Sequence, residues 1–148
     1  MTTITISSDY GYVLLAGVAS TIMTTYLGLR VGGARARAKV PYPFLYAEKA
    51  EAEQDKDKMV FNCYQRAHQN TLENYPSFLL TLFVAGVGFP KIAAASGFVW
   101  IASRLAYAHG YYTGDPKKRS RGFFGYIGML TLLATSTLTG VKTITNGF

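Results

Sequence analysis

The sequence predicts an all-α membrane protein, a four-transmembrane-helix bundle that forms one domain over residues 1–148. Apolar residues make up 49% of the chain and charged residues only 16%, which is less charge than a soluble domain usually carries. Four stretches are long enough to cross a hydrocarbon core, which requires about 20 residues per helix. The basic residues gather in two of the loops between these stretches, as they do in membrane proteins.

The expected spans cover about residues 10–30, 61–86, 91–112 and 121–144. The first carries no charge over residues 12–29, and the fourth carries none over residues 122–141. The third is interrupted only by Arg104 and His109. No lysine or arginine precedes the first span, so it lacks the basic start of a signal peptide and we expect it to be retained.

The distribution of basic residues predicts the orientation. Of the 15 lysines and arginines, 11 fall in the loop after the first span or in the loop after the third. Positively charged loops stay in the cytoplasm, so we expect both of these loops in the cytosol. Part of the first, residues 47–58, is mixed in charge and is expected to be solvated. Because the basic residues form no soluble patch, the net charge of +7 does not indicate a nucleic-acid partner.

A row of polar residues marks the second span. Arg66, Asn70 and Glu73 are spaced at i, i+4 and i+7, which places them on one face of a helix, and Asn62 extends the row. Such groups are costly inside a membrane and usually line a polar cavity. A purely structural ion pair between Arg66 and Glu73 is the alternative explanation. Pro76 follows three residues later and is expected to bend the helix beside this row.

The third span carries a second polar stripe, formed by Arg104, Tyr107 and Tyr111. In an antiparallel pair of spans both stripes lie toward the cytosolic side, so we expect them to meet in one site. An interfacial aromatic belt is the alternative explanation for the two tyrosines. Arginines favour a ligand with carboxylates, and Glu73 would suit a ligand amine. The stripes therefore predict a site for a small anionic peptide that meets an apolar partner.

Cys63 is the only cysteine, so the chain has no internal disulfide and no CxxC motif. We expect it to be a small packing residue rather than a reactive thiol. No metal is expected.

These motifs resemble the MAPEG family of membrane proteins. The resemblance rests on RAHQNTLENYP, ARAKVPYP, RLAYAHGYY and four spans in about 150 residues, and it covers nearly the whole chain. It implies a homotrimer with glutathione sites between subunits that face the cytosol. It implies a membrane-bound glutathione transferase with peroxidase activity, which conjugates glutathione to lipophilic electrophiles or reduces lipid hydroperoxides. It places the protein in lipid metabolism, in the endoplasmic reticulum or, as the alternative, the outer mitochondrial membrane.

The resemblance also implies which residues hold glutathione, the co-substrate: Arg35, Arg66, His68, Asn70, Glu73, Tyr107 and Tyr111. The arginine that faces the thiol in relatives lies in the third loop. Direct counting from Tyr111 reaches Lys118, and one inserted residue reaches Arg119. We expect Arg119 to be the catalytic residue, with Lys118 and Arg121 as alternatives, because members of the family carry an arginine in this role.

Two positions depart from relatives that form leukotrienes. Ala36 stands where they carry a second arginine, which weakens a claim of efficient leukotriene synthesis. Asn74 stands where they carry a tyrosine, so one ligand contact is altered. A non-catalytic lipid-binding scaffold of the same fold is the main alternative function. A small transporter or channel is a second one, although the chain shows no repeat-built pathway.

Overall fold

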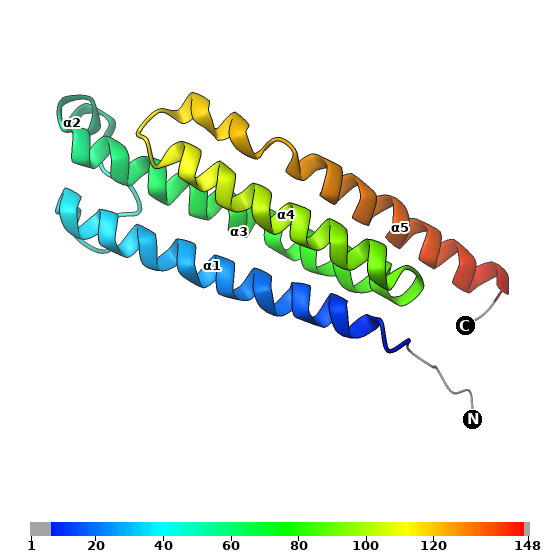
Figure 1. The fold of residues 1–148 in the computed structure, drawn as a ribbon. Helices are drawn as coiled ribbons and strands as arrows, with labels where there is room; N and C mark the ends of the chain where they lie inside the picture. The colour runs from blue at the N-terminus through cyan, green and yellow to red at the C-terminus, as the bar shows by residue number, and fades with distance from the viewer. Residues whose placement is uncertain (1–6, 147–148) are drawn as a thin grey trace. The chain divides into compact units, whose positions relative to one another are not determined.

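The computed structural model describes residues 7–146, and every regular element in this range is a helix. Figure 1 shows them in chain order: α1 (Tyr10–Ala38), α2 (Lys49–Gln54), α3 (Lys56–Gly88), α4 (Pro90–Tyr111), the short 3-10 helix η1 (Pro116–Gly122) and α5 (Gly125–Asn146). The prediction of an all-α protein is therefore confirmed.

Two helices in the described range, α1 and α5, are long and apolar enough to cross a membrane by length and composition. Helices α3 and α4 occupy the other two expected spans, and α3 is continuous through Pro76. Polar groups such as Arg66 and Glu73 lower the apolar character of α3. The four-span arrangement therefore stays a prediction.

Several helix boundaries differ from those of the expected spans: α3 begins earlier, at Lys56, and α5 begins later, at Gly125. Helix α1 continues past residue 30 to Ala38, because the alanines and arginines of its last turns favour helix. It ends at Ala38, and the next residue, Lys39, has a φ of 53°, the left-handed conformation common after a helix. The mixed-charge segment that we expected to be solvated loop contains α2, a six-residue helix.

The chain divides into two compact units. The first, here called the apolar unit, comprises the described residues within Met1–Thr21, Tyr75–Ala102 and Phe124–Phe148. The second, here called the charged unit, comprises Ile22–Asn74 and Ser103–Phe123. Each unit has its own packing and is described by itself.

Stacked rings and small residues hold the apolar unit together. The ring of Phe78 stacks on Trp100 at 3.9 Å between centroids, with only 9° between the planes. Gly97 faces Leu82 so closely that an added Cβ would lie 3.0 Å from it. The hydroxyls of Ser20 and Tyr75 share a hydrogen bond of 2.9 Å. Close approach of small residues is the usual way in which membrane helices pack.

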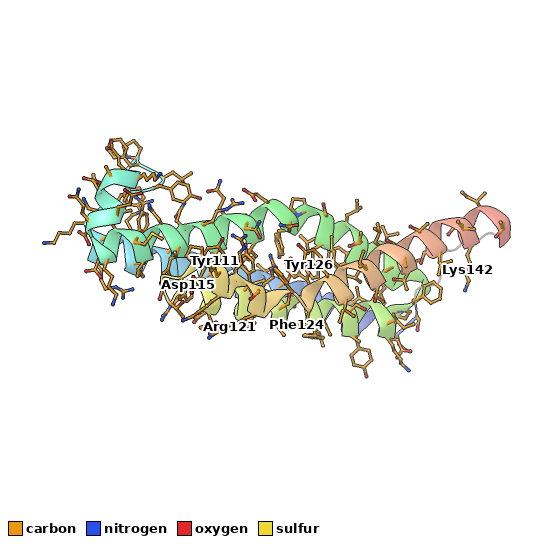
Figure 2. All side chains as sticks on the ribbon, turned by 90° about the horizontal axis from the view of Figure 1, so that it is seen from above. Tyr111, Asp115, Arg121, Phe124, Tyr126 and Lys142 are labelled. Carbon is orange, nitrogen blue, oxygen red and sulfur yellow. The ribbon has the colours of Figure 1, made fainter. Side chains whose placement is uncertain are left out.

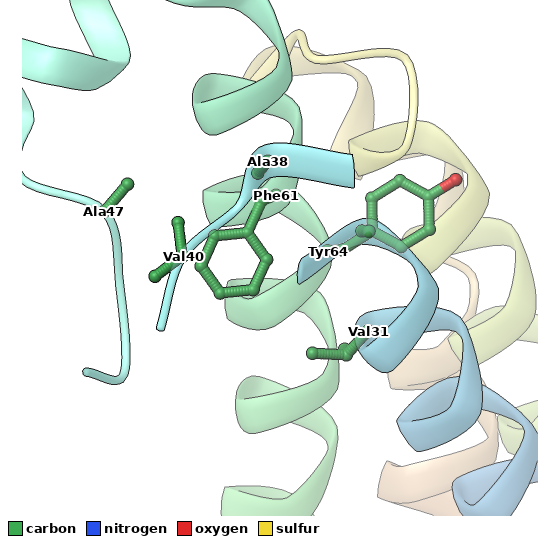
Figure 3. Packing of buried hydrophobic residues seen from close by; sticks show 7 residues of the cluster. Val31, Ala38, Val40, Ala47, Phe61 and Tyr64 are labelled. Atoms are coloured by element: carbon green, nitrogen blue, oxygen red, sulfur yellow. The ribbon is translucent and has the colours of Figure 1, made fainter. Parts of the chain in front are cut away.

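The charged unit has its core at the end where α1, the following loop and α3 meet. Phe61 is fully buried among Val31, Val40 and Ala47, as Figure 3 shows. Tyr64 belongs to the same cluster. This core anchors the polar half of α3, on which the site is built.

Candidate functional site

The polar stripes of α3 and α4 meet in the charged unit. Arg66 donates from a terminal nitrogen to Glu73 Oε1 at 2.9 Å. The Asn70 amide donates to Glu73 Oε2 at 3.4 Å and accepts from Arg104 at 3.1 Å. These bonds link one carboxylate, one amide and two guanidinium groups across two helices. The side chains of Arg66 and Glu73 remain 44% and 47% exposed, so a ligand can reach both.

The two tyrosines of the second stripe lie beside this network. The Arg104 guanidinium stacks over the Tyr107 ring at 4.4 Å, and the rings of Tyr107 and Tyr111 meet edge to face at 5.2 Å. Both tyrosines are less than a tenth exposed. They are therefore packed within the unit, which is not the arrangement of an exposed aromatic belt.

The third loop is held against the end of α4 by local capping and by two glycines. Asp115 caps η1 by accepting a hydrogen bond from the Lys117 backbone, with Pro116 at the first helical position. A Cβ on Gly110 would collide with the Lys118 carbonyl, and a Cβ on Gly122 would lie 2.7 Å from the Ser103 carbonyl. The backbone of η1 therefore lies directly on α4. Tyr111, Asp115 and Arg121, labelled in Figure 2, mark the chain from the end of α4 into η1.

This packing brings Arg119 to the second stripe. Its guanidinium donates to the Tyr111 hydroxyl at 3.4 Å and is otherwise exposed. The hydrogen bond and the nearby phenol raise the pKa of Arg119 above its usual value, so the group stays a cation at any physiological pH. Lys118 contributes its backbone to the contact with Gly110.

A cavity of about 250 Å³ opens between the two stripes and the loop. Arg66 and Tyr111 line it together with Tyr46, Asn62 and Cys63. Cys63 is 3% exposed and free, as a packing residue would be. Within residues 7–146, no group of three or more His, Cys, Asp or Glu side chains is placed to hold a metal ion.

Asn62, which the spacing adds to the polar row, bonds elsewhere. Its amide accepts from the Ala47 backbone N–H at 2.8 Å and donates to the Ala47 carbonyl at 3.0 Å. It therefore fixes the first loop to α3. Two turns further along α3, Gln69 accepts a hydrogen bond of 3.0 Å from the Tyr46 hydroxyl, which strengthens the same attachment. Spacing along α3 could not reveal these bonds, because their partners lie in the loop.

Two expected glutathione contacts lie away from the network in the single chain. Arg35 is 8% exposed and donates to the carbonyls of Val40, Phe44 and Leu45, the shortest bond being 2.7 Å to Phe44. The His68 ring packs at Gly28, where a Cβ would lie 3.5 Å from Nε2. His68 follows Arg66 by two residues, which places it on nearly the opposite face of α3. Their role as ligand contacts stays a prediction.

Arg104 and the glycines are the parts of the site that the expected ligand set leaves out. Arg104 belongs to the predicted stripe, and its bond to Asn70 makes it the link between the helices. Gly110 and Gly122 gave no signal in the sequence, because their importance depends on the path of η1.

Comparison with known proteins gives a family and several relatives. The family model "MAPEG family" matches residues 13–139. Microsomal glutathione S-transferase 2 of Homo sapiens is 43% identical over 84 residues, which are 56% of this chain and 54% of that protein. The same protein of Mus musculus is 42% identical over 77 residues, 51% of this chain and 52% of that protein.

Leukotriene C4 synthase of Cavia porcellus is 38% identical over 79 residues, 53% of each chain. The matched region thus spans about half the length of these relatives. The motifs lead us to expect a likeness to microsomal glutathione S-transferase 3, whereas the relatives found are named microsomal glutathione S-transferase 2 and leukotriene C4 synthase. Since the family model covers most of the described residues, the chain belongs to the MAPEG family.

Proposed function

We propose that this chain is a membrane-bound glutathione transferase with glutathione-dependent peroxidase activity. The observation that carries the proposal is the network of Arg66, Asn70, Glu73 and Arg104. Arg66 also lines a cavity with Tyr111, whose hydroxyl accepts a hydrogen bond from Arg119. Relatives named as glutathione S-transferases support the same conclusion.

Arg66 and Glu73 provide the charges that a tripeptide needs. A guanidinium binds a carboxylate through two parallel hydrogen bonds, and a carboxylate accepts from an ammonium group. Glutathione carries both groups, so it would replace part of the Arg66–Glu73 pair with contacts of its own. Asn70, whose amide is oriented by Arg104, would offer a hydrogen bond to the peptide backbone.

Arg119 would activate the thiol. A free thiol has a pKa of about 8.5, so only a small fraction is thiolate at neutral pH. A nearby cation stabilises the thiolate and lowers this pKa. The thiolate then attacks an electrophilic carbon of a lipophilic substrate and expels its leaving group. With a lipid hydroperoxide, two glutathione molecules give the alcohol, water and glutathione disulfide.

The proposed site is completed by a second copy of the chain. Arg35 and His68 lie away from Arg66 within one chain, so they reach the same ligand only if neighbouring subunits share it. A homotrimer with sites between subunits provides this arrangement, as the family resemblance implies. We propose that these sites face the cytosol from the endoplasmic reticulum, or from the outer mitochondrial membrane.

The test is the kinetics of Arg119→Ala with glutathione and a lipid hydroperoxide or a lipophilic electrophile. Removing a group that stabilises developing charge costs on the order of 100-fold to 1,000-fold in kcat. Glutathione affinity should change much less. Because the cation favours the thiolate, its loss should move the pH dependence of the rate upward, toward the pKa of free glutathione. Arg119→Lys should restore part of the rate.

Lys118→Ala is the matched control, since Lys118 offers its backbone rather than its side chain to the fold. Loss of activity in Lys118→Ala with full activity in Arg119→Ala would move the catalytic role by one residue. A wild-type protein that neither binds glutathione nor turns over would instead support the non-catalytic scaffold.

A further inference from the structure

The loop after α1 folds back along the end of its own helix. Arg35, on the last turns of α1, holds the carbonyls of Val40, Phe44 and Leu45. Its guanidinium is also sandwiched between the rings of Tyr42 and Phe61, at 4.6 and 4.7 Å. The loop therefore runs beside Arg35 and does not project away from the end of α1.

A groove of about 330 Å³ runs between the helix end and this loop. Most of its wall is apolar, and Arg35 and Lys39 complete the lining. The apolar part consists of Gly32, Ala36, Val40, Pro41 and Tyr42. The first expected span ends at about residue 30, so the groove begins where the chain would leave the hydrocarbon core. Tyr42 is 80% exposed beside the groove and Phe44 is 61% exposed nearby. Exposed aromatic rings at this depth are typical of the membrane interface.

Lys39 supplies the charge at the rim of the groove. Its backbone is in the left-handed conformation, with φ of 53°, which a lysine rarely adopts. Among residues 7–146, the Lys39 ammonium has no ion-pair partner, whereas the Arg35 guanidinium is already used by the loop carbonyls. Arg37 is exposed nearby on the last turn of α1. The groove thus combines an apolar wall with an available cation.

We propose that this groove binds an anionic membrane phospholipid, with the phosphate at Lys39 and the first methylene groups of one chain along Gly32 and Ala36. A soluble phosphate would gain nothing from the apolar wall, and an uncharged lipid would gain nothing from Lys39. Basic pockets at the cytoplasmic ends of membrane helices bind anionic headgroups in this way. Arg35 also lines the groove and is an expected glutathione contact, but the phosphate is assigned to Lys39, so the proposal does not depend on glutathione binding.

Lipid binding is measured by native mass spectrometry of the purified full chain, titrated with phosphatidylglycerol or phosphatidylcholine of the same acyl chains. One lysine near an anionic headgroup contributes enough for a roughly fivefold preference for phosphatidylglycerol. Lys39→Gln should remove this preference and leave phosphatidylcholine binding unchanged. Lys49→Gln is the control, because Lys49 is 90% exposed on α2 and lies outside the groove.

A second pair of variants tests the shape of the groove. Gly32 and Gly33 are both exposed, and a Cβ on either meets nothing within 4 Å, but only Gly32 lines the groove. Gly32→Leu should therefore lower the binding of both lipids, and Gly33→Leu should not. Thermal unfolding of both variants checks the fold, and Lys39→Gln still decides the question if Gly32→Leu unfolds.

Several results would overturn the proposal. Equal binding of the two lipids by the wild type would show that Lys39 does not select an anionic headgroup. Equal effects of Gly32→Leu and Gly33→Leu on lipid binding would show that the lipid does not occupy the groove. Displacement of phosphatidylglycerol by inorganic phosphate would indicate a phosphate site. A change in oligomer mass in Gly32→Leu, without preferential lipid binding in the wild type, would indicate that a second copy covers this surface.

Discussion

The two units of this chain differ most in their charge. The apolar unit contains three charged residues, Asp9, Lys91 and Lys142. The charged unit therefore holds the other 13 of the 15 basic residues and 7 of the 8 acidic ones. Both units are built from parts of the same long helices, so the difference lies in the side chains and not in the kind of element.

Polar side chains also bond differently in the two units. In α5 of the apolar unit, Thr131, Thr135 and Thr137 each bond a carbonyl four residues earlier in their own helix. In the charged unit, Asn62, Asn70 and Arg35 bond groups in other elements or loops. Hydroxyls are thus satisfied within one helix, whereas amides and guanidinium groups join different elements and so create a site. We therefore expect the apolar unit to determine the stability of the protein and the charged unit to determine its ligand chemistry.

Removing the central ring of the apolar unit should have the largest effect. Trp100→Ala takes away the partner of Phe78 and should cost about 3–5 kcal/mol of stability, as large aromatic deletions do. Glutathione affinity of the folded fraction should be unchanged. Thermal unfolding in detergent and isothermal titration of glutathione measure the two quantities. A change in affinity that exceeds the change in stability would break the division between the units.

Gly110→Ala should give the next largest effect, and it should act on turnover. The added methyl group collides with the Lys118 carbonyl and displaces the loop that carries Arg119. Misplacing a catalytic group by about 1 Å costs on the order of 100-fold in rate. Steady-state kinetics with glutathione measure this loss.

Gly140→Ala is the matched control for Gly110→Ala. It places the same methyl group on α5 of the apolar unit, where it meets nothing within 4 Å. Its turnover should equal that of the wild type. Equal losses in both variants would mean that the path of η1 does not matter.

Glu73→Gln should weaken glutathione binding by roughly 10-fold to 100-fold, the usual value of a hydrogen bond to a charged group. The carboxylate is held by Arg66 and Asn70, so its loss also releases the Arg66 guanidinium. The coupling between the two residues is obtained from the dissociation constants of glutathione for Glu73→Gln, for Arg66→Ala and for the double variant. Additive losses would show that the two residues bind the ligand independently.

Thr137→Val should have the smallest effect, within about 0.5 kcal/mol of stability and with no change in turnover. Its hydroxyl bonds only the Leu133 carbonyl of the same helix, which already has a backbone partner. The same thermal unfolding assay measures it. A large loss would mean that hydroxyls of α5 contribute more than local hydrogen bonds.

The sequence predicted the helical class and the meeting of the two stripes because both depend on regular spacing. Arg66, Asn70 and Glu73 follow the helical repeat, and charge-free stretches reveal long apolar helices without knowledge of their neighbours. The bond from Arg104 to Asn70 then follows once α3 and α4 run side by side.

Contacts made by loops were not predictable in this way. The carbonyls that Arg35 holds come from a segment with no periodic pattern, and the amide of Asn62 turns to Ala47 only because that segment folds back. Gly110 looks like any helical glycine until the backbone of η1 lies on it. Such contacts depend on the path of the chain between elements, which spacing within an element does not encode.

The hold of Arg35 on the first loop has a consequence for sequence variation. Its three acceptors are main-chain oxygens, which every amino acid possesses, so the attachment does not depend on which side chains stand at positions 40, 44 and 45. The exposed residues Phe44 and Leu45 can therefore be exchanged to suit different bilayers while the loop keeps its path, whereas Val40 is buried in the core of the charged unit. The guanidinium itself allows no such exchange, since a lysine lacks the planar fork that reaches several carbonyls at once.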